Sequence, residues 1–176
     1  MTPPSRGWGP LARTFLFTVL VPGTVTVLVP YGILRSEDPA TLTLGVLRIV
    51  GAQWMVLGAW VYFRCAWDFA VVGRGTPAPL DPPRELVARG LYRYVRNPMY
   101  LGVLSVVVGE ALFFESLRLL QYAAALVAGF HLFVVLYEEP ALRRQFGESY
   151  ARYLGTVPRW IPRRPRENSW RANGAS

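Results

Sequence analysis

The side chains best suited to chemistry in this sequence lie in one stretch, residues 84–102, where a cationic segment meets an apolar one. Asn97 can cap a helix with its side-chain oxygen, and Pro98 fits the first helical position, so the pair predicts a helix start. The unpaired N–H groups of that first turn could bind an anionic group, and tyrosine faces could bind a cationic one. The basic and aromatic neighbours are Arg84, Arg89, Arg93, Arg96, Tyr92 and Tyr100.

The same stretch also has a purely topological interpretation. Arginines beside a membrane helix follow the positive-inside bias, and tyrosines at such a position form an interfacial belt. The residue types alone therefore leave ligand binding and membrane orientation both open.

A second group with chemical potential is the acidic pair Glu138-Glu139, which closes a long apolar run. Two acids at a helix C-terminus are electrostatically unfavourable there, which favours a binding role over a solvated surface pair. His131 lies two turns before the pair, and it either projects into the same site or packs as a hydrogen-bonded helix residue. Glu110 is a charge within another apolar run, so we expect it to pair with Arg48 or His131 across helices.

The elements that must position these groups are apolar helices. Hydrophobic residues make up 52% of the 176 residues and charged residues 17%, a pairing that indicates membrane spans. The net charge of +8 comes from arginines that flank apolar runs, so membrane topology explains it better than nucleic-acid binding does. The single cysteine, Cys65, excludes an internal disulfide and a cysteine-based metal cluster, and no metal-ligand spacing is present.

We predict an all-α integral membrane protein with a single domain over residues 1–176. It has about four transmembrane helices, an amphipathic C-terminal helix on the cytoplasmic face and a disordered tail. The approximate bounds are 14–34, 42–64, 97–114 and 119–137 for the spans, 141–154 for the amphipathic helix and 163–176 for the tail. Most arginines flank the chain ends or follow the second span, so we expect both termini in the cytoplasm, and we place the protein in the plasma (inner) membrane.

This topology brings the two chemical groups together. A short turn joins the spans 97–114 and 119–137, so they are antiparallel neighbours, and the start of one lies at the same membrane face as the end of the other. Tyr92, Asn97 and Tyr100 should therefore lie near the acidic pair. Carboxylates, arginines and aromatic faces at one site suit S-adenosylmethionine, because they can bind its amino group, carboxylate and sulfonium.

The order of the residues in both groups resembles a known superfamily. Residues 90–102 read Gly-Leu-Tyr-(x3)-Arg-Asn-Pro-Met-Tyr-Leu-Gly, similar to the Gly-x-Tyr-(x3)-Arg-His-Pro-x-Tyr-x-Gly signature of the isoprenylcysteine carboxyl methyltransferase and phospholipid methyltransferase superfamily of integral membrane enzymes. Asn97 departs from this signature, because it stands where the family usually has histidine and it does not titrate. The second block of the superfamily is matched at Glu138-Glu139, Phe146-Gly147, Tyr150, Tyr153 and Val157-Pro158.

The resemblance implies an S-adenosylmethionine-dependent methyltransferase that acts on a lipophilic small molecule, lipid or isoprenoid from the bilayer. Arg96 and Glu139 are assigned to catalysis, and Val134, together with His131 on the same helix, to substrate binding. The expected partners are this acceptor and membrane lipids, with no metal and no nucleic acid, and the oligomeric state stays open. The implied cofactor-binding residues are Arg84, Glu85, Leu86, Val87, Tyr92, Asn97, Pro98, Met99, Tyr100, Glu138 and Glu139.

Two alternatives stay open. Membrane reductases of the sterol type, which use NADPH, share an Arg-His-Pro-x-Tyr-like block. Their second block has an Arg-Asp…Cys…Lys-Tyr-Gly pattern, which differs from the Glu-Glu and Phe-Gly of this chain. The other alternative is a non-catalytic membrane protein derived from the methyltransferase family, for which Asn97 is the main argument.

Overall fold

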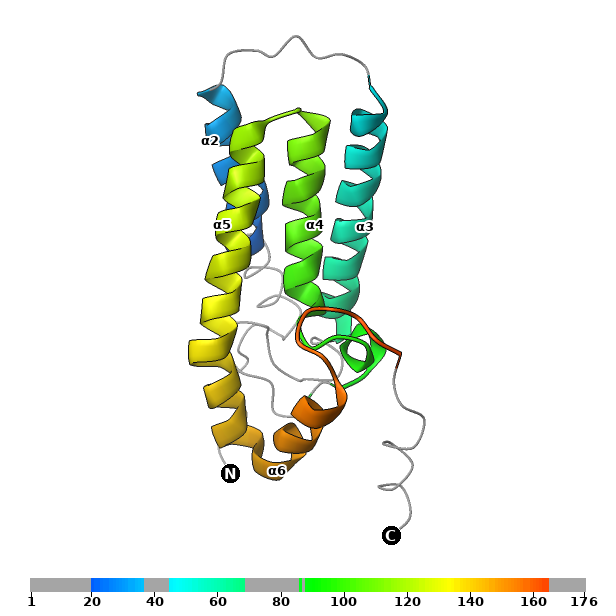
Figure 1. Cartoon of the computed structure of the whole chain (residues 1–176), viewed down its shortest axis with the longest axis vertical. Helices are drawn as coiled ribbons and strands as arrows, with labels where there is room; N and C mark the ends of the chain where they lie inside the picture. Colours follow the sequence, from blue (N-terminus) through cyan, green and yellow to red (C-terminus); the bar gives the residue numbers. More distant parts are fainter. Residues whose placement is uncertain (1–19, 37–44, 69–85, 87, 165–176) are drawn as a thin grey trace, which may run out of the picture.

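A computed structural model describes residues 20–36, 45–68, 86 and 88–164 of the chain. Every regular element within these residues is helical, which agrees with the predicted all-α class. The helices α2, α5, α4 and α3 stand side by side along the long axis, and α6 turns back beneath them (Figure 1). In chain order the elements are η1 (Thr24–Leu28), α2 (Val29–Arg35), α3 (Val46–Asp68), η3 (Gly90–Arg93), α4 (Pro98–Phe113), α5 (Leu117–Phe133), η4 (Val134–Glu138) and α6 (Glu139–Thr156).

The outer surface of the bundle is apolar. Two helices are long and apolar enough to cross a membrane, Val46–Asp68 and the continuous Leu117–Thr156, and two shorter apolar helices are Leu20–Arg35 and Pro98–Phe113. Only 17% of the most apolar part of each long helix is buried, whereas the core helix of a soluble protein is mostly buried. The low burial therefore favours membrane helices over the core helices of a soluble protein. Exposed large side chains on α3 include Trp54, Trp60, Phe63 and Trp67.

The count of four spans stays a prediction, because the described parts of two of the four apolar helices are shorter than a bilayer crossing requires. The predicted C-terminal helix lies within α6, and its attachment to a membrane face is likewise untested. Only the first two residues of the predicted tail, Arg163 and Arg164, are described, and residues 165–176 lie outside the described residues.

Helices α3 and α4 pack backbone against backbone. A Cβ atom on Gly58 would lie 2.6 Å from the carbonyl oxygen of Gly102, and one on Gly51 would lie 2.6 Å from the carbonyl oxygen of Gly109. The two pairs are two helical turns apart on each helix, so all four glycines face one seam. Small residues at such a seam let apolar helices approach closely. The seam fixes the position of α4, whose first turn carries much of the candidate site.

The expected pairing of Glu110 is wrong for the described residues. No ion pair joins its carboxylate to Arg48 or His131, and its Oε2 is buried without a hydrogen-bond partner. The glycine seam sets the helix register so that the Arg48 guanidinium lies over the Phe113 ring, 5.7 Å from its centre. His131 lies near the far end of α5 and contacts Trp160 instead.

Candidate functional site

The start of α4 is held by a long-range contact. The helix begins at Pro98 with Asn97 in the N-cap position, as the Asn-Pro pair predicts. The predicted side-chain cap is wrong, however, because Asn97 Nδ2 donates to the carbonyl oxygen of Arg159 at 3.1 Å and the side chain caps no helix N–H. Asn97 is buried, so this bond ties the start of α4 firmly to the C-terminal part of the chain.

That C-terminal part is a segment without regular secondary structure, residues 157–164, which we call the strap. It follows α6, which bends at Gly147, where φ is 52°. This left-handed conformation is one that glycine adopts without steric cost. Val157 leaves the helix in an extended conformation, as the residue before a proline favours, and Pro158 follows. The bend and the proline together direct the chain back toward α4 (Figure 1).

The strap is paired with the segment that precedes α4. The backbone N–H of Arg96 donates to the carbonyl oxygen of Pro158 at 2.8 Å, and the N–H of Arg163 donates to the carbonyl oxygen of Tyr94 at 2.9 Å. These bonds satisfy backbone groups that would otherwise need water. They also fix the position of the Arg96 side chain.

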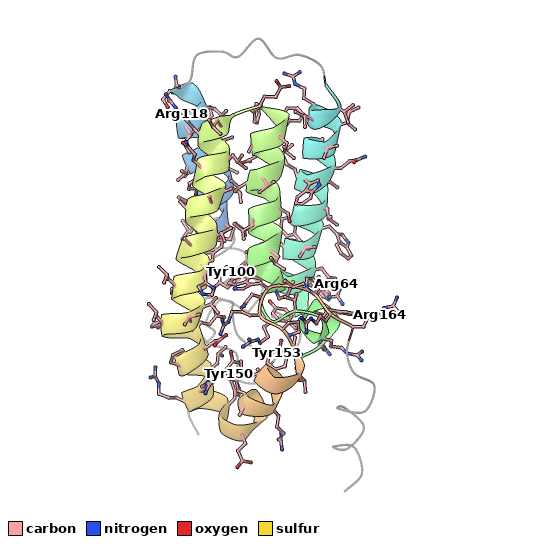
Figure 2. All side chains as sticks on the ribbon, viewed as in Figure 1. Arg64, Tyr100, Arg118, Tyr150, Tyr153 and Arg164 are labelled. Carbon is pink, nitrogen blue, oxygen red and sulfur yellow. The ribbon has the colours of Figure 1, made fainter. Side chains whose placement is uncertain are left out.

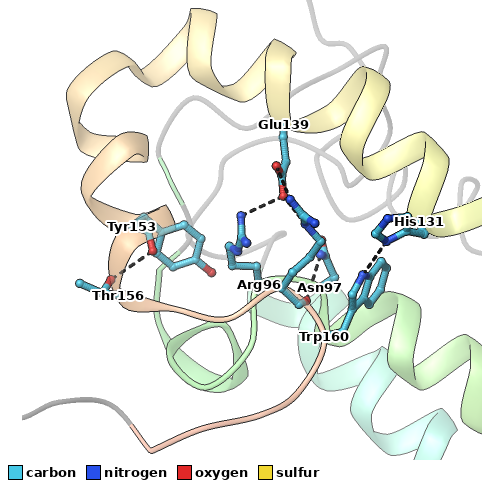
Figure 3. Close-up of polar contacts among 8 residues, drawn as sticks. Arg96, Asn97, His131, Glu139, Tyr153, Thr156 and Trp160 are labelled. Atoms are coloured by element: carbon cyan, nitrogen blue, oxygen red, sulfur yellow. Dashed lines mark hydrogen bonds and ion pairs between the residues drawn. The ribbon is translucent and has the colours of Figure 1, made fainter.

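The acidic pair lies against the start of α4, as predicted. Tyr100 Oη donates to Glu138 Oε2 at 2.9 Å. Arg96 Nη1 donates to Glu139 Oε1 at 2.8 Å (Figure 3). Arg159 from the strap adds a forked contact, with Nε 2.7 Å from Glu139 Oε1 and Nη2 3.0 Å from Oε2. Such two-pronged guanidinium–carboxylate contacts are strong and fix orientation as well as distance.

The two acids differ in their surroundings. The buried carboxylate of Glu139 is shared by two guanidinium groups, and its hydrogen bond is the main cause of the raised pKa of Arg159. Within the described residues, Glu138 has the neutral Tyr100 hydroxyl as its hydrogen-bond partner and no ion pair. Glu139 is therefore committed to positioning two arginines. Glu138 has no such partner in the described part of the chain, and burial raises the pKa of its carboxyl, so a cation bound beside it would stabilise its charged form.

An aromatic layer adjoins Glu138. The Tyr100 ring lies 4.8 Å from that of Phe130 and 6.4 Å from that of Trp160, centre to centre. Trp160 Nε1 donates to His131 Nδ1 at 3.1 Å, so the exposed His131 is part of this layer. Val134, in contrast, is 1% exposed and packs within the bundle, so its side chain does not face an open site.

A second cluster supports the site from the η3 side. Tyr153 Oη donates to the carbonyl oxygen of Tyr92 at 2.8 Å, and Tyr92 packs against Cys65 and Met99. Burial raises the pKa of Tyr92 well above its usual value, so this phenol stays neutral. Leu86 packs against the buried tyrosines of α6. Figure 2 shows that Tyr100, Tyr150 and Tyr153 gather at one end of the bundle, opposite Arg118.

The structure thus brings most of the predicted site residues to one end of the bundle. The exceptions are three predicted cofactor residues, Arg84, Glu85 and Val87, which lie outside the described residues. Sequence reasoning missed the roles of Arg159 and Trp160, both on the strap. The Val-Pro dipeptide marks an extended segment there, but nothing in the local sequence shows that this segment returns to α4.

Groups of both charge signs lie in this arrangement. Glu138 offers a carboxylate beside three aromatic rings, and Arg96 retains a buried Nε–H without a hydrogen-bond partner among the described residues. Within the same residues, no group of three or more His, Cys, Asp or Glu side chains could hold a metal ion. The site therefore has separate places for a cationic and an anionic group.

Comparison with known proteins defines the class. A family model described as phospholipid methyltransferase matches residues 46–149, more than half of the chain, and the chain belongs to this family. The matched region runs from α3 into α6 and contains the start of α4 and the acidic pair. This confirms the resemblance drawn from the two sequence blocks and supports methyltransferase activity rather than a reductase. Neither the curated proteins nor the solved structures contain a significant match.

Proposed function

We propose that the protein transfers a methyl group from S-adenosylmethionine to a lipophilic acceptor, a small molecule, lipid or isoprenoid, that reaches the site from the bilayer. Family membership supports methyl transfer. The observation that supports this cofactor is the division of labour between the acids, in which Glu139 holds two arginines and Glu138 has no cationic partner among the described residues.

The groups of the cofactor match those of the site. Glu138 would accept hydrogen bonds from the amino group of the cofactor, and the unpartnered Nε–H of Arg96 would donate to its carboxylate. The faces of Tyr100 and Trp160 would attract the sulfonium, as aromatic rings attract other cations. Asn97 would serve by holding the strap in place, which requires hydrogen bonding but no titration.

The reaction is a direct in-line displacement. When bound, S-adenosylmethionine would supply its methyl group to a nucleophilic atom of the acceptor, and the electron pair of the broken carbon–sulfur bond would stay with S-adenosylhomocysteine. The positive charge of the sulfonium disperses as the methyl group moves, so a site shielded from water favours the step. Catalysis here rests on holding the two reactants in line, and positioning of this kind can supply several kcal/mol of rate enhancement, roughly 7–11 in the best intramolecular cases.

The cofactor assignment is tested by calorimetry on the full-length protein in detergent, with S-adenosylmethionine and NADPH as separate titrants. We expect micromolar binding of S-adenosylmethionine and no binding of NADPH. Binding of NADPH alone would transfer the protein to the reductase class, and binding of neither would favour a non-catalytic relative.

We further propose that the site faces the cytoplasm at the plasma (inner) membrane, with both termini on that side. The bias of arginines toward the chain ends and the connection after α3 supports this orientation. A single cysteine on the exposed end of the strap, Arg164→Cys in a Cys65→Ala background, should react with a membrane-impermeant maleimide only after the cells are permeabilised. Labelling of intact cells would reverse the topology.

A further inference from the structure

The strap has one apolar anchor, at its beginning. Val157 is 3% exposed and packs with Tyr150 and Tyr153, whereas residues 161–164 are exposed. A chain segment that is fixed at one end and exposed at the other can swing about the fixed end. Val157 is thus placed as a hinge.

Beyond this hinge, most contacts of the strap are polar, and an exception is the Trp160 ring, which lies 6.4 Å from the Tyr100 ring. Three are made by main-chain atoms of the strap: Pro158 and Arg159 accept through their carbonyl oxygens, and Arg163 donates through its N–H. When the strap opens, water can replace each of these three main-chain contacts, at a net cost of about 0.5–1.5 kcal/mol per bond, whereas nothing replaces a buried apolar anchor. The strap can therefore leave its place without unfolding the helices beneath it.

Two side chains hold the strap down at different points. Arg159 grips Glu139, and the indole N–H of Trp160 donates to His131 on α5. Figure 3 shows the strap passing across the start of α4, with the Trp160 ring directed at His131. The residues under the strap include Arg96 and Tyr100, which the proposed function assigns to the cofactor.

We propose that the strap is a lid over the cofactor site and that the Trp160–His131 hydrogen bond is its latch. This inference rests on the proposed function, because the covered residues are those assigned to S-adenosylmethionine. The lid opens about Val157 to admit the cofactor and closes to shield the sulfonium from water. His131 then acts through Trp160, as a positioning residue, and does not touch the methyl acceptor.

Trypsin cleavage of the Arg159–Trp160 bond reports the state of the lid. In the closed lid the Arg159 side chain is bound to Glu139 and cannot enter the protease, so cleavage requires opening. The full-length protein in detergent is digested briefly, and the peptide that begins at residue 160 is quantified by mass spectrometry. Each rate is divided by the rate for the same bond in the unfolded variant, which removes effects of the local sequence.

Variants of the latch make the test specific. His131→Phe removes the acceptor and Trp160→Phe removes the donor, and each should speed cleavage about three- to tenfold, as expected for one exposed hydrogen bond. His131→Gln can still accept a hydrogen bond and should stay near the wild-type rate. Glu148→Gln, on the exposed face of α6, is the control and should not change it.

The cofactor is then added to the same digest. S-adenosylmethionine should slow cleavage of the wild-type protein. The cofactor should also dissociate faster from the two open variants, His131→Phe and Trp160→Phe, than from the wild-type protein. Wild-type cleavage rates in both open variants would overturn the latch, and calorimetric binding without slower cleavage would overturn the lid. If calorimetry shows no binding of S-adenosylmethionine, the proposed function fails and takes the lid with it, even where the open variants are cleaved faster.

Discussion

Glu138→Gln is expected to weaken the binding of S-adenosylmethionine about 10- to 100-fold while leaving the unfolding temperature unchanged. A hydrogen bond to a charged group contributes about 1.5–3 kcal/mol, and the substitution removes the charge but keeps the shape. The amide oxygen of glutamine can still accept from Tyr100, so the contact seen in the structure survives. Calorimetry and a thermal-shift assay on the same preparation measure both quantities.

Glu139→Gln is the matched variant, and it should behave in the opposite way. Its carboxylate neutralises Arg96 and Arg159, whose side chains are 12% and 31% exposed, and their charges would be left without a counter-ion. Breaking a buried ion pair costs about 3–5 kcal/mol, and we expect about 3, because the solvent that reaches Arg159 screens its charge. The unfolding temperature should therefore fall. Equal stability of the two variants, or unchanged affinity in Glu138→Gln, would contradict the division of roles.

This division could not be predicted from the sequence. Glu138 and Glu139 are adjacent in the motif and look equivalent there. The predicted topology places both of them near the start of the helix that begins at Pro98. The contact with Arg159 distinguishes Glu139 from Glu138. Arg159 lies 20 residues further along the chain, beyond the bend at Gly147. The direction of a bend depends on a backbone angle that the presence of a glycine permits but does not specify.

Local sequence signals, in contrast, were sufficient to predict where α4 begins and that α4 and α5 are neighbours. Asn97-Pro98 predicts the first residue of α4 because proline is tolerated there and little further inside a helix. The short turn at Ser116, where the side chain accepts from the N–H of Leu119, makes α4 and α5 antiparallel neighbours. That topology brings Tyr100 to Glu138, as expected. The predicted pairing of Glu110 with Arg48 or His131 was wrong because such a pairing depends on the register between helices, which apolar composition leaves undetermined.

The register of α3 against α4 is set by glycines. In the sequence these glycines are simply members of apolar runs. Gly102 closes the first motif block, and its physical role is visible in the seam with α3: a Cβ atom there would lie 2.9 Å from the Gly58 carbonyl oxygen and 2.9 Å from the Tyr62 backbone nitrogen. Backbone atoms of a packed helix cannot move aside as a flexible side chain can. A methyl group at this position must therefore push the two helices apart.

Gly102→Ala and Gly58→Ala are accordingly expected to lower the free energy of unfolding by about 3 kcal/mol, the upper part of the range for overpacked sites. The sign is informative, because glycine to alanine in a helix interior normally stabilises by about 0.5–1 kcal/mol. Gly129→Ala on α5 is the matched control, since nothing lies within 4 Å of its Cβ position, and it should stabilise. Thermal unfolding in detergent measures all three variants.

The same variants connect the seam to the site. If the helices separate, the start of α4 moves relative to η4, and the Tyr100–Glu138 contact that orients the free carboxylate is lost. Gly102→Ala should therefore weaken S-adenosylmethionine binding as well, although residue 102 lies outside the ligand contacts we propose. Stability and affinity equal to those of Gly129→Ala would show that the helices can adjust, and the motif glycine would then need an explanation other than close packing.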